Sequence, residues 1–345
     1  MGSAHNWLRS SLLNRSFHAV IFDSTPSSIS PLSCGVPQHQ GSVLGPILFI
    51  IYVSPITSIV NQQQYADNTQ LFLFLSPTSL SSKLWSIQQC LSSLHSWFLH
   101  NGLVLNPSKT EAICFGTNPR VKSLSNLTSI DVAGASVPLS NHVKLIGVTF
   151  DRLLNFDKHI SNVCSSSYVH IRALRHIRPY LDSETSNTIA CAIIGSRLDY
   201  ASSVLSGISS RNIHRIQRVQ NSLARVVTRS TTSSTTALSA LHWQPSRQRI
   251  DYKLASPVHR SLHNACPQYL SYLLHPYNPT RQLRSTSLNL FYQPRVNTAL
   301  DSRSFRHAGP LIWNSLPPHL RSIDYYTTFK SNLKIHLFSS SISGP

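Results

Sequence analysis

The residues of this chain best suited to chemistry are Asp67 and Asn68, which stand side by side in the segment Tyr65-Ala66-Asp67-Asn68. Apolar or β-prone runs precede them at 64–66 and follow them at 69–75. This pattern predicts a β-hairpin whose turn at Asp67-Asn68 presents the aspartate. The side chain of Asn68 is neutral, so Asp67 supplies the one negative charge of this segment.

Other reactive residue types do not form recognisable sites. Lys109 alone is typical of a solvated lysine at a strand edge. The six cysteines contain no CxxC pair, which argues against a zinc knuckle and favours scattered thiols in a reducing compartment. No local signature of a Ser/His/Asp nucleophile is present. Four histidines lack a ligand spacing with carboxylates: His95, His100, His142 and His159.

The charge of the chain is strongly positive and unevenly distributed. The 345 residues include 30 Lys and Arg against 12 Asp and Glu, a net charge of +18. Residues 1–150 hold 7 basic and 4 acidic residues, a net charge of +3. Residues 151–345 hold 23 basic and 8 acidic residues, a net charge of +15. Such an excess suits a polyanion, with nucleic acid as the first candidate. The alternative is a basic, solvated surface without a partner.

Apolar periodicity predicts the elements that position these residues. A helix opened by Pro46 is expected over 46–52, and an amphipathic helix over 80–101. Short strands are expected at 111–115 and 143–149. The apolar run from Ile47 to Ile51 is too short to span a membrane, so no membrane partner is expected.

The second half is predicted to be mainly helical, with helices over 157–178, 183–195 and 211–229. The Ser/Thr segment 230–236 is typical of a linker, and a small unit rich in proline and aromatic residues follows.

The predicted helix 211–229 has two distinct faces. Its apolar face carries Ile213, Ile216, Val219, Leu223 and Val226. A stripe of arginines on another face favours phosphate contacts, although the same stripe is compatible with an exposed face that only solvates the helix. The arginines are Arg211, Arg215, Arg218, Arg225 and Arg229.

The order of several motifs resembles the palm of a non-LTR (LINE-type) retrotransposon reverse transcriptase, whose pattern is GVPQGSVLGP, an apolar strand and YADD. Here GVPQ at 35–38 and GSVLGP at 41–46 precede the YADN segment. NGLVLNPSKTEAICFG (101–116) and LIGVTFDRLLNFDKHI (145–160) resemble the later palm and the start of the thumb. His242-Trp243-Gln244-Pro245 and Trp313-Asn314 resemble the region after the thumb.

The resemblance implies an α+β fold. It implies a partial polymerase palm with a small antiparallel sheet over 1–150, a helical thumb-like region over 151–229, a linker over 230–236 and a C-terminal retrotransposon tail region over 237–345. Asp67 would bind Mg²⁺, and Lys109 would protonate the leaving pyrophosphate. The partner would be RNA or DNA without sequence preference, inside the cell in the nucleus or cytoplasm. Template or nucleotide contacts would come from Gly35, Pro37, Gln38 and Gly41.

Departures from the family pattern predict an inactive protein. His39 and Gln40 are inserted within the family's PQG. Because each extended residue spans about 3.3 Å, the insertion should displace Gln38 or Gly41 by several ångströms. Asn68 replaces the second aspartate of the turn, and the chain begins after the segment that carries the family's first one. Asp23 is interpreted as a turn residue, not a substitute. Because two bridging aspartates are needed for two metals about 4 Å apart, the Mg²⁺ site is expected to be incomplete. The chain would then be a truncated reverse transcriptase or, alternatively, a non-catalytic nucleic-acid-binding protein or decayed gene product.

Overall fold

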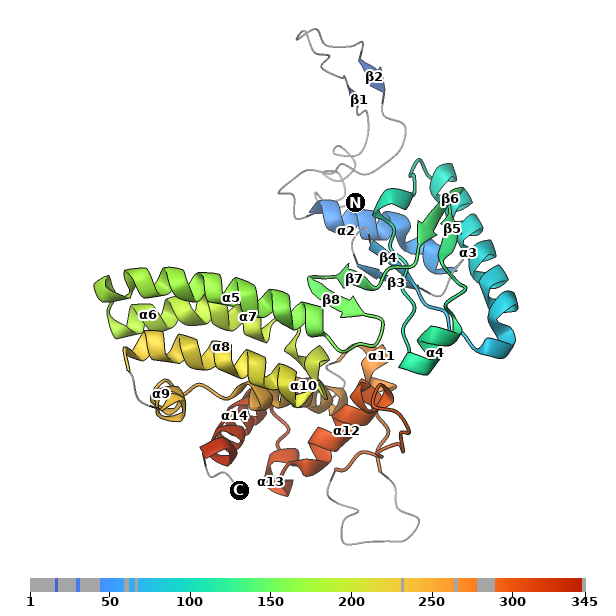
Figure 1. The fold of residues 1–345 in the computed structure, drawn as a ribbon. Helices are drawn as coiled ribbons and strands as arrows, with labels where there is room; N and C mark the ends of the chain where they lie inside the picture. The colour runs from blue at the N-terminus through green and yellow to red at the C-terminus, as the bar shows by residue number, and fades with distance from the viewer. Residues whose placement is uncertain are drawn as a thin grey trace, which may run out of the picture. The chain divides into compact units, whose positions relative to one another are not determined.

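The computed structural model describes residues 16–17, 29–31, 44–58, 62–65, 68–230, 233–263, 266–277 and 289–342. Within these ranges the chain forms helices and two-stranded antiparallel sheets, the first of which pairs β1 (Ser16–Phe17) with β2 (Ser30–Pro31) (Figure 1). The chain divides into two compact units, residues 1–112 with 122–140, and residues 113–121 with 141–345. The expectation of helices combined with small antiparallel sheets is confirmed.

The first unit is built around a long helix. It contains α2 (Leu44–Val53), η1 (Ser54–Ser58), β3 (Gln62–Tyr65), β4 (Asn68–Leu71), η2 (Pro77–Ser79) and α3 (Leu80–His100). Both helices predicted here are confirmed within two residues. Leu94 and Phe98 of α3 form a small core with Val53 and Ile56, and Leu71 at the end of β4 packs against it. The hairpin is therefore attached to α3 by apolar burial.

The rest of this unit includes a hairpin that the sequence did not reveal. Strands β5 (Ser129–Val132) and β6 (Ala135–Pro138) pair through a two-residue turn at Ala133 and Gly134, both with positive φ. They follow η3 (Pro107–Lys109) and α4 (Asn118–Ser123). The strand predicted at 111–115 is wrong: Ala112 makes one isolated bridge with Leu139, and within the described ranges the segment joins no named strand.

The second unit contains residues 113–121, which include most of α4, and then another hairpin, where one strand over 143–149 was predicted. Strands β7 (His142–Leu145) and β8 (Val148–Asp151) reverse at Ile146 and Gly147, with φ of 44° and 77°. The hydroxyl of Tyr200 donates to the Ile146 carbonyl at 2.6 Å. A Cβ at position 147 would lie 3.1 Å from the Tyr200 ring, so glycine supplies both the turn conformation and the room for this contact.

Helices make up the remainder of this unit, and the three predicted ones are confirmed. They are α5 (Asp157–Ile177), then α6 (Ser183–Ile189) continued by a π-helical segment η5 (Ala190–Gly195) and α7 (Ser196–Asp199), and α8 (Ser210–Thr228). Shorter elements are η4 (Arg178–Tyr180), η6 (Ser202–Leu205) and α9 (Ser234–Ala240). Their apolar faces share one core with β8, which includes Ile160, Ile194, Val219 and Leu223.

The C-terminal residues are also helical and belong to this same unit. Helix α10 (Ser246–Leu262) packs against α8, α12 (Phe305–Ser315) and α14 (Tyr326–Ile342). A second core gathers here around the fully buried Trp313 and Phe329. Shorter elements are α11 (Gln268–Ser271), η7 (Asp301–Arg303) and α13 (Pro318–Arg321).

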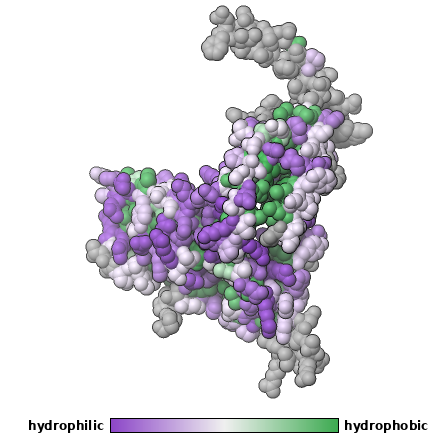
Figure 2. All heavy atoms as spheres, turned by 45° about the vertical axis from the view of Figure 1, so that its right-hand side comes forward, coloured by the Kyte–Doolittle hydropathy of each residue, from purple (hydrophilic) through white to green (hydrophobic). Residues whose placement is uncertain are grey.

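The two units differ in surface character. Several large apolar side chains of the first unit are exposed, among them Phe74 (92%), Val104 (76%) and Trp85 (66%). In the view of Figure 2, apolar residues gather on its visible face, while much of the visible surface of the second unit is hydrophilic. Among the described residues, no helix is long and apolar enough to cross a membrane.

Candidate catalytic turn and nucleic-acid interface

The hairpin expected to carry the catalytic aspartate is present. Strands β3 and β4 pair in a register that places Tyr65 opposite Asn68, so two residues, Ala66 and Asp67, connect them. Asn68 is therefore an exposed residue of β4 and not part of the predicted turn. Asp67 itself lies outside the described residues, as do Gly35, Pro37, Gln38 and Gly41.

Lys109 lies at the end of η3, and its side chain is exposed. The short helix is fixed by Asn106, whose Oδ1 accepts from the Ser108 backbone N–H at 3.0 Å and from the Ser108 hydroxyl at 2.6 Å. An open pocket of about 540 Å³ lies between this segment and β6, lined in part by Asn106, Ser108 and Thr110. A polar, rigid loop therefore presents the lysine to solvent.

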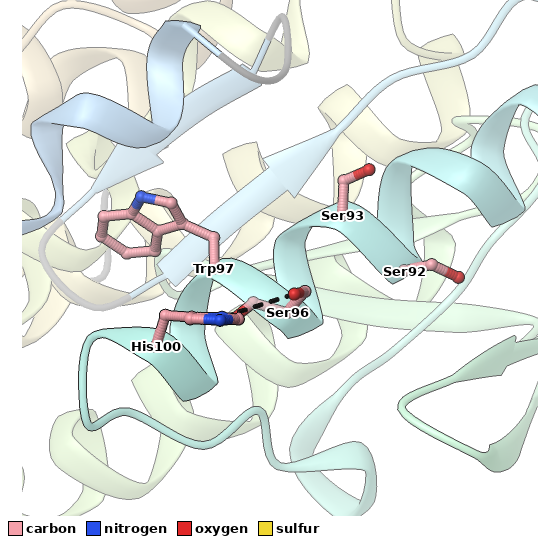
Figure 3. Close-up of a pocket in the computed structure, with 5 residues that line it drawn as sticks. All are labelled: Ser92, Ser93, Ser96, Trp97 and His100. Atoms are coloured by element: carbon pink, nitrogen blue, oxygen red, sulfur yellow. Dashed lines mark hydrogen bonds between the residues drawn. The ribbon is translucent and has the colours of Figure 1, made fainter.

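No metal centre is formed by the residues that the structure describes: no group of three or more His, Cys, Asp or Glu side chains could hold an ion. The buried His159 accepts from the Thr149 backbone N–H through Nδ1 at 3.4 Å, and burial lowers its pKa. His100 is bonded to the Ser96 carbonyl of its own helix at 2.7 Å. It borders a shallow pocket of about 550 Å³ lined by side chains of α3 alone (Figure 3). These two histidines serve local structure.

The basic helix α8 runs parallel to α5, as bonds at both ends show. At the N-terminal ends, Asn212 Nδ2 donates to Asp157 Oδ1 at 2.7 Å. At the C-terminal ends, Nε and Nη2 of the buried Arg178 donate to the Val227 carbonyl at 3.0 and 2.6 Å. The cation of Arg178 thus caps the last turn of α8, where carbonyl groups lack helical partners. These bonds fix both ends of α8 against α5.

Four of the five predicted arginines lie in α8 at spacings that share one face, and Arg229 follows its last residue with positive φ, but the five are not equivalent. Arg215 donates to Ser161 Oγ of α5 at 2.7 Å and is half-buried. Arg229 donates to the Arg178 carbonyl at 2.5 Å. Three others are exposed, and no hydrogen bond or ion pair of their side chains occurs within the described ranges: Arg211, Arg218 and Arg225.

Helix α5 contributes to the same surface, which the sequence reading missed. Ser161, Tyr168, Arg172 and Arg175 recur at spacings of three, four or seven and therefore share one side of α5. Ser161 touches Arg215, so this side borders the arginine face of α8. Tyr168, Arg172 and Arg175 are exposed. We name the basic surface by its members: Arg172 and Arg175 of α5, with Arg211, Arg215, Arg218, Arg225 and Arg229 of α8.

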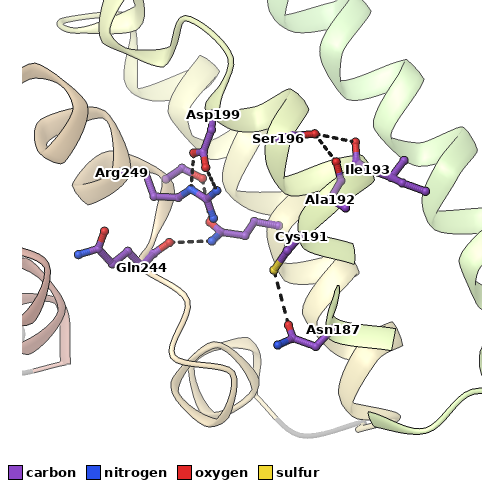
Figure 4. A network of polar contacts seen from close by, with 10 residues as sticks. Asn187, Cys191, Ala192, Ile193, Ser196, Asp199, Gln244 and Arg249 are labelled. Atoms are coloured by element: carbon purple, nitrogen blue, oxygen red, sulfur yellow. Dashed lines mark hydrogen bonds and ion pairs between the residues drawn. The ribbon is translucent and has the colours of Figure 1, made fainter. Parts of the chain in front are cut away.

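Acidic side chains of this unit do little to neutralise these arginines locally. In the part of the chain that the structure describes, one ion pair forms, between Arg249 of α10 and Asp199 of α7 (Figure 4). Asp151 instead accepts three backbone N–H groups, from Leu153, Asn155 and Phe156, at 2.6–3.1 Å. Asp182 caps α6 by accepting from Thr185 N–H at 2.7 Å, a bond that lowers the pKa of its carboxyl.

The segment His242-Trp243-Gln244-Pro245 joins helices rather than forming a reactive site. Gln220 of α8 donates to the Gln244 carbonyl at 2.7 Å and accepts from Ser246 Oγ at 3.0 Å. The Gln244 side chain donates to the Lys334 carbonyl of α14 at 2.8 Å. A buried polar network thus links α8, α10 and α14, with the Arg249–Asp199 pair nearby (Figure 4).

Comparison with known proteins decides the family. Residues 2–150 match the family model described as reverse transcriptase (RNA-dependent DNA polymerase). The chain is 24% identical to the RNA-directed DNA polymerase from mobile element jockey of Drosophila melanogaster, over 81% of this chain and 30% of that protein. These matches support a non-LTR retrotransposon reverse transcriptase, with the family model covering residues 2–150. It is also 27% identical to the probable RNA-directed DNA polymerase from transposon X-element of the same species, over 64% of this chain and 24% of that protein.

The resemblance seen in the sequence is thereby confirmed. This reverse transcriptase chain spans less than a third of the length of these curated relatives. No solved structure matches it.

Proposed function

We propose that this reverse transcriptase chain binds RNA or DNA without sequence preference through the basic surface, and that a polypeptide of residues 1–345 does not synthesise DNA by itself. The observation that carries the first part is the row of exposed, unpaired arginines on α8 beside those of α5. The second part rests on a single metal-binding aspartate, Asp67, followed by Asn68. Nucleic acid as the partner fits an intracellular location, in the nucleus or cytoplasm.

The dimensions of the basic surface suit a nucleic-acid backbone. From Arg211 to Arg225 the helix rises about 21 Å at 1.5 Å per residue. That length matches about six phosphates of one duplex strand, at about 3.4 Å each. Guanidinium groups bind phosphate oxygens in a bidentate manner, and such contacts carry no base information. Binding should therefore be salt-sensitive and indifferent to sequence.

Residues 1–345 supply few of the groups that polymerisation needs. Two metals about 4 Å apart must activate the primer oxygen and hold the triphosphate. Asp67 would be one Mg²⁺ ligand, whereas Asn68 would offer only a neutral oxygen. Lys109 is exposed on its rigid loop and would be free to meet a pyrophosphate. Gly35, Pro37, Gln38 and Gly41 would contact template or nucleotide, with the insertion at His39-Gln40 altering their spacing.

A second candidate function is polymerase activity within a longer polypeptide. The match of residues 2–150 to the reverse transcriptase model and the retained Asp67 and Lys109 favour it. Primer extension separates the two. The purified chain would receive a primed RNA template with Mg²⁺ or Mn²⁺, and we expect no extension. Extension that is abolished by Asp67→Ala would refute the proposed inactivity.

Binding is tested on the full chain with matched charge changes. One variant neutralises Arg211, Arg218 and Arg225 to glutamine. Its control neutralises three exposed cations on other helices, Lys253→Gln, Arg306→Gln and Lys334→Gln, with the same loss of net charge. We expect the first variant to bind a labelled RNA or DNA much more weakly than the control at one fixed salt concentration. Equal losses in both variants would show that net charge, and not this surface, drives binding.

A further inference from the structure

A second exposed surface of this unit is formed by tyrosines near α11. Residues 275–277 and 290–292 form a short antiparallel bridge at Pro276 and Phe291. Its two bonds run from Tyr277 N–H to the Leu290 carbonyl and from Tyr292 N–H to the His275 carbonyl, both at 2.8 Å. Side chains alternate across such a ladder. Phe291 faces the core at 4% exposure, so Tyr277 and Tyr292 point outward, at 39% and 49%.

Two more tyrosines lie directly before this ladder. Tyr269 lies in α11 and Tyr272 follows it, three positions apart and therefore on one side of the turn. Tyr269 and Tyr272 are 61% and 71% exposed, more than Tyr277 and Tyr292. Leu274, between Tyr272 and the ladder, is buried in the same core as Phe291, and we name Tyr269, Tyr272, Tyr277 and Tyr292 the tyrosine surface. Large exposed aromatic rings gathered in this way mark binding sites.

The motif Trp313-Asn314 holds this surface in place. Asn314 of α12 accepts from the Phe291 N–H through Oδ1 at 3.0 Å and donates to the Phe291 carbonyl through Nδ2 at 2.8 Å. Trp313 Nε1 donates to the Asn289 carbonyl at 2.7 Å. Three side-chain bonds from α12 thus fix the segment that carries Tyr292. A rigid platform loses little conformational entropy when it binds a ligand.

The charge around the tyrosines identifies the kind of ligand. Residues 254–300 contain four Lys and Arg and no Asp or Glu. Arg295 is exposed three residues after Tyr292. Aromatic rings in an entirely basic setting match unpaired bases linked by phosphates, because rings stack on bases while cations bind the backbone. In a duplex the bases are stacked on one another, so their faces could not contact these rings.

We propose that the tyrosine surface is a second nucleic-acid site, separate from the basic surface, which stacks unpaired bases of single-stranded RNA or DNA. It rests on observations independent of those behind the proposed function. The two surfaces make different demands on the ligand: the basic surface needs only phosphates, whereas the tyrosine surface needs bases.

The experiment uses the full chain and two probes of equal length and charge. One is a 20-nucleotide oligothymidylate and the other is its abasic counterpart, with the same sugar–phosphate backbone. We expect the wild type to bind the thymidylate more tightly by at least about tenfold. Each lost stack should weaken thymidylate binding by a factor between about 5 and about 150. Tyr272→Ala combined with Tyr292→Ala should therefore remove most of the preference and leave abasic binding unchanged.

Three variants sharpen the result. Tyr325→Ala removes a tyrosine that is 79% exposed outside this surface and should retain the preference. Tyr272→Phe with Tyr292→Phe should also retain it, because the ring persists. Neutralising Arg211, Arg218 and Arg225 should weaken both probes equally and leave their ratio unchanged. Circular dichroism checks that each variant is folded.

Two outcomes would overturn the proposal. One is a wild type that binds both probes equally, since stacking would then contribute nothing. The other is an alanine double variant that keeps the preference but loses self-association in analytical ultracentrifugation. That result would assign the tyrosines to a contact with a second copy of the chain.

Discussion

Replacing Arg178 tests how the basic helix is held. This guanidinium is 5% exposed and lies just after α5. Nε and Nη2 donate to the Val227 carbonyl of α8, and Nη1 donates to the Leu181 carbonyl at 2.7 Å. Arg178→Ala would remove these three charge-assisted bonds, together with a 3.5 Å bond from Nη2 to Ser183 Oγ, and leave the Val227 carbonyl without this donor.

The expected cost follows from these contacts. Hydrogen bonds to charged groups contribute about 1.5–3 kcal/mol each, and an unsatisfied buried group costs about 1–3 kcal/mol. Two of the bonds share the Val227 carbonyl and all come from one side chain, so their energies are not additive, and we expect Arg178→Ala to lower the free energy of unfolding by about 3–4 kcal/mol. Arg178→Lys keeps the cation but not the planar fork, so about half of that loss is expected.

Urea denaturation followed by circular dichroism would measure both changes as shifts of the transition midpoint. The matched control is Arg175→Ala, one turn earlier on α5 and exposed. Its effect should stay within about 0.5 kcal/mol, as for most surface substitutions. A loss below about 1 kcal/mol for Arg178→Ala, similar to the control, would refute the view that this side chain anchors α8.

Three other changes test further contacts. Burial lowers the pKa of His259 in the folded chain, so as pH falls the unfolded chain binds a proton at a higher pH than the folded chain does. The free energy of unfolding should therefore fall as pH drops below about 6.5. In urea titrations, His259→Gln should weaken this pH dependence. Gln220→Ala should cost about 2–3 kcal/mol and Gln244→Ala about 1–2 kcal/mol, because Gln220 makes two bonds of the network and the Gln244 side chain one. Asp151→Ala should lower the melting temperature more than the exposed Asp131→Ala, because only Asp151 accepts three backbone N–H groups after β8.

Local periodicity was enough to predict the long helices. The apolar stripes of 80–100, 157–177 and 210–228 repeat every three or four residues, and each became a helix within two residues of its predicted ends. Helices α10 and α12 were not recognised, since proline interrupts their patterns. Pro257 lies inside α10 and Pro310 inside α12.

Hairpins were harder to predict because their turns use unusual residues. Ile146 and Ala133 both adopt positive φ, which non-glycine residues seldom do. Without a glycine pair or Asn-Gly, the segment 143–149 was interpreted as one strand. The hairpin around Asp67 was found, but its register depends on cross-strand pairing, which placed Asn68 within β4.

Periodicity placed the arginines of α8 on one face but could not tell which are bonded. Arg215 is bound by Ser161 and Arg229 by a carbonyl of Arg178, both from distant parts of the chain. From the sequence alone, Arg178 contributed only to the net charge. Its contact with the end of α8 follows from the packing of α5 on α8. Long-range contacts therefore decide which arginines are free to bind phosphate.

The most direct test of the central claim is the salt dependence of binding. For single strands, the logarithm of the association constant falls with the logarithm of salt concentration by about 0.7 for each phosphate contact. Neutralising Arg211, Arg218 and Arg225 should reduce that slope by about 2, whereas the control at Lys253, Arg306 and Lys334 should leave it nearly unchanged. Equal slopes for both triple variants and the wild type would contradict a nucleic-acid interface along α5 and α8.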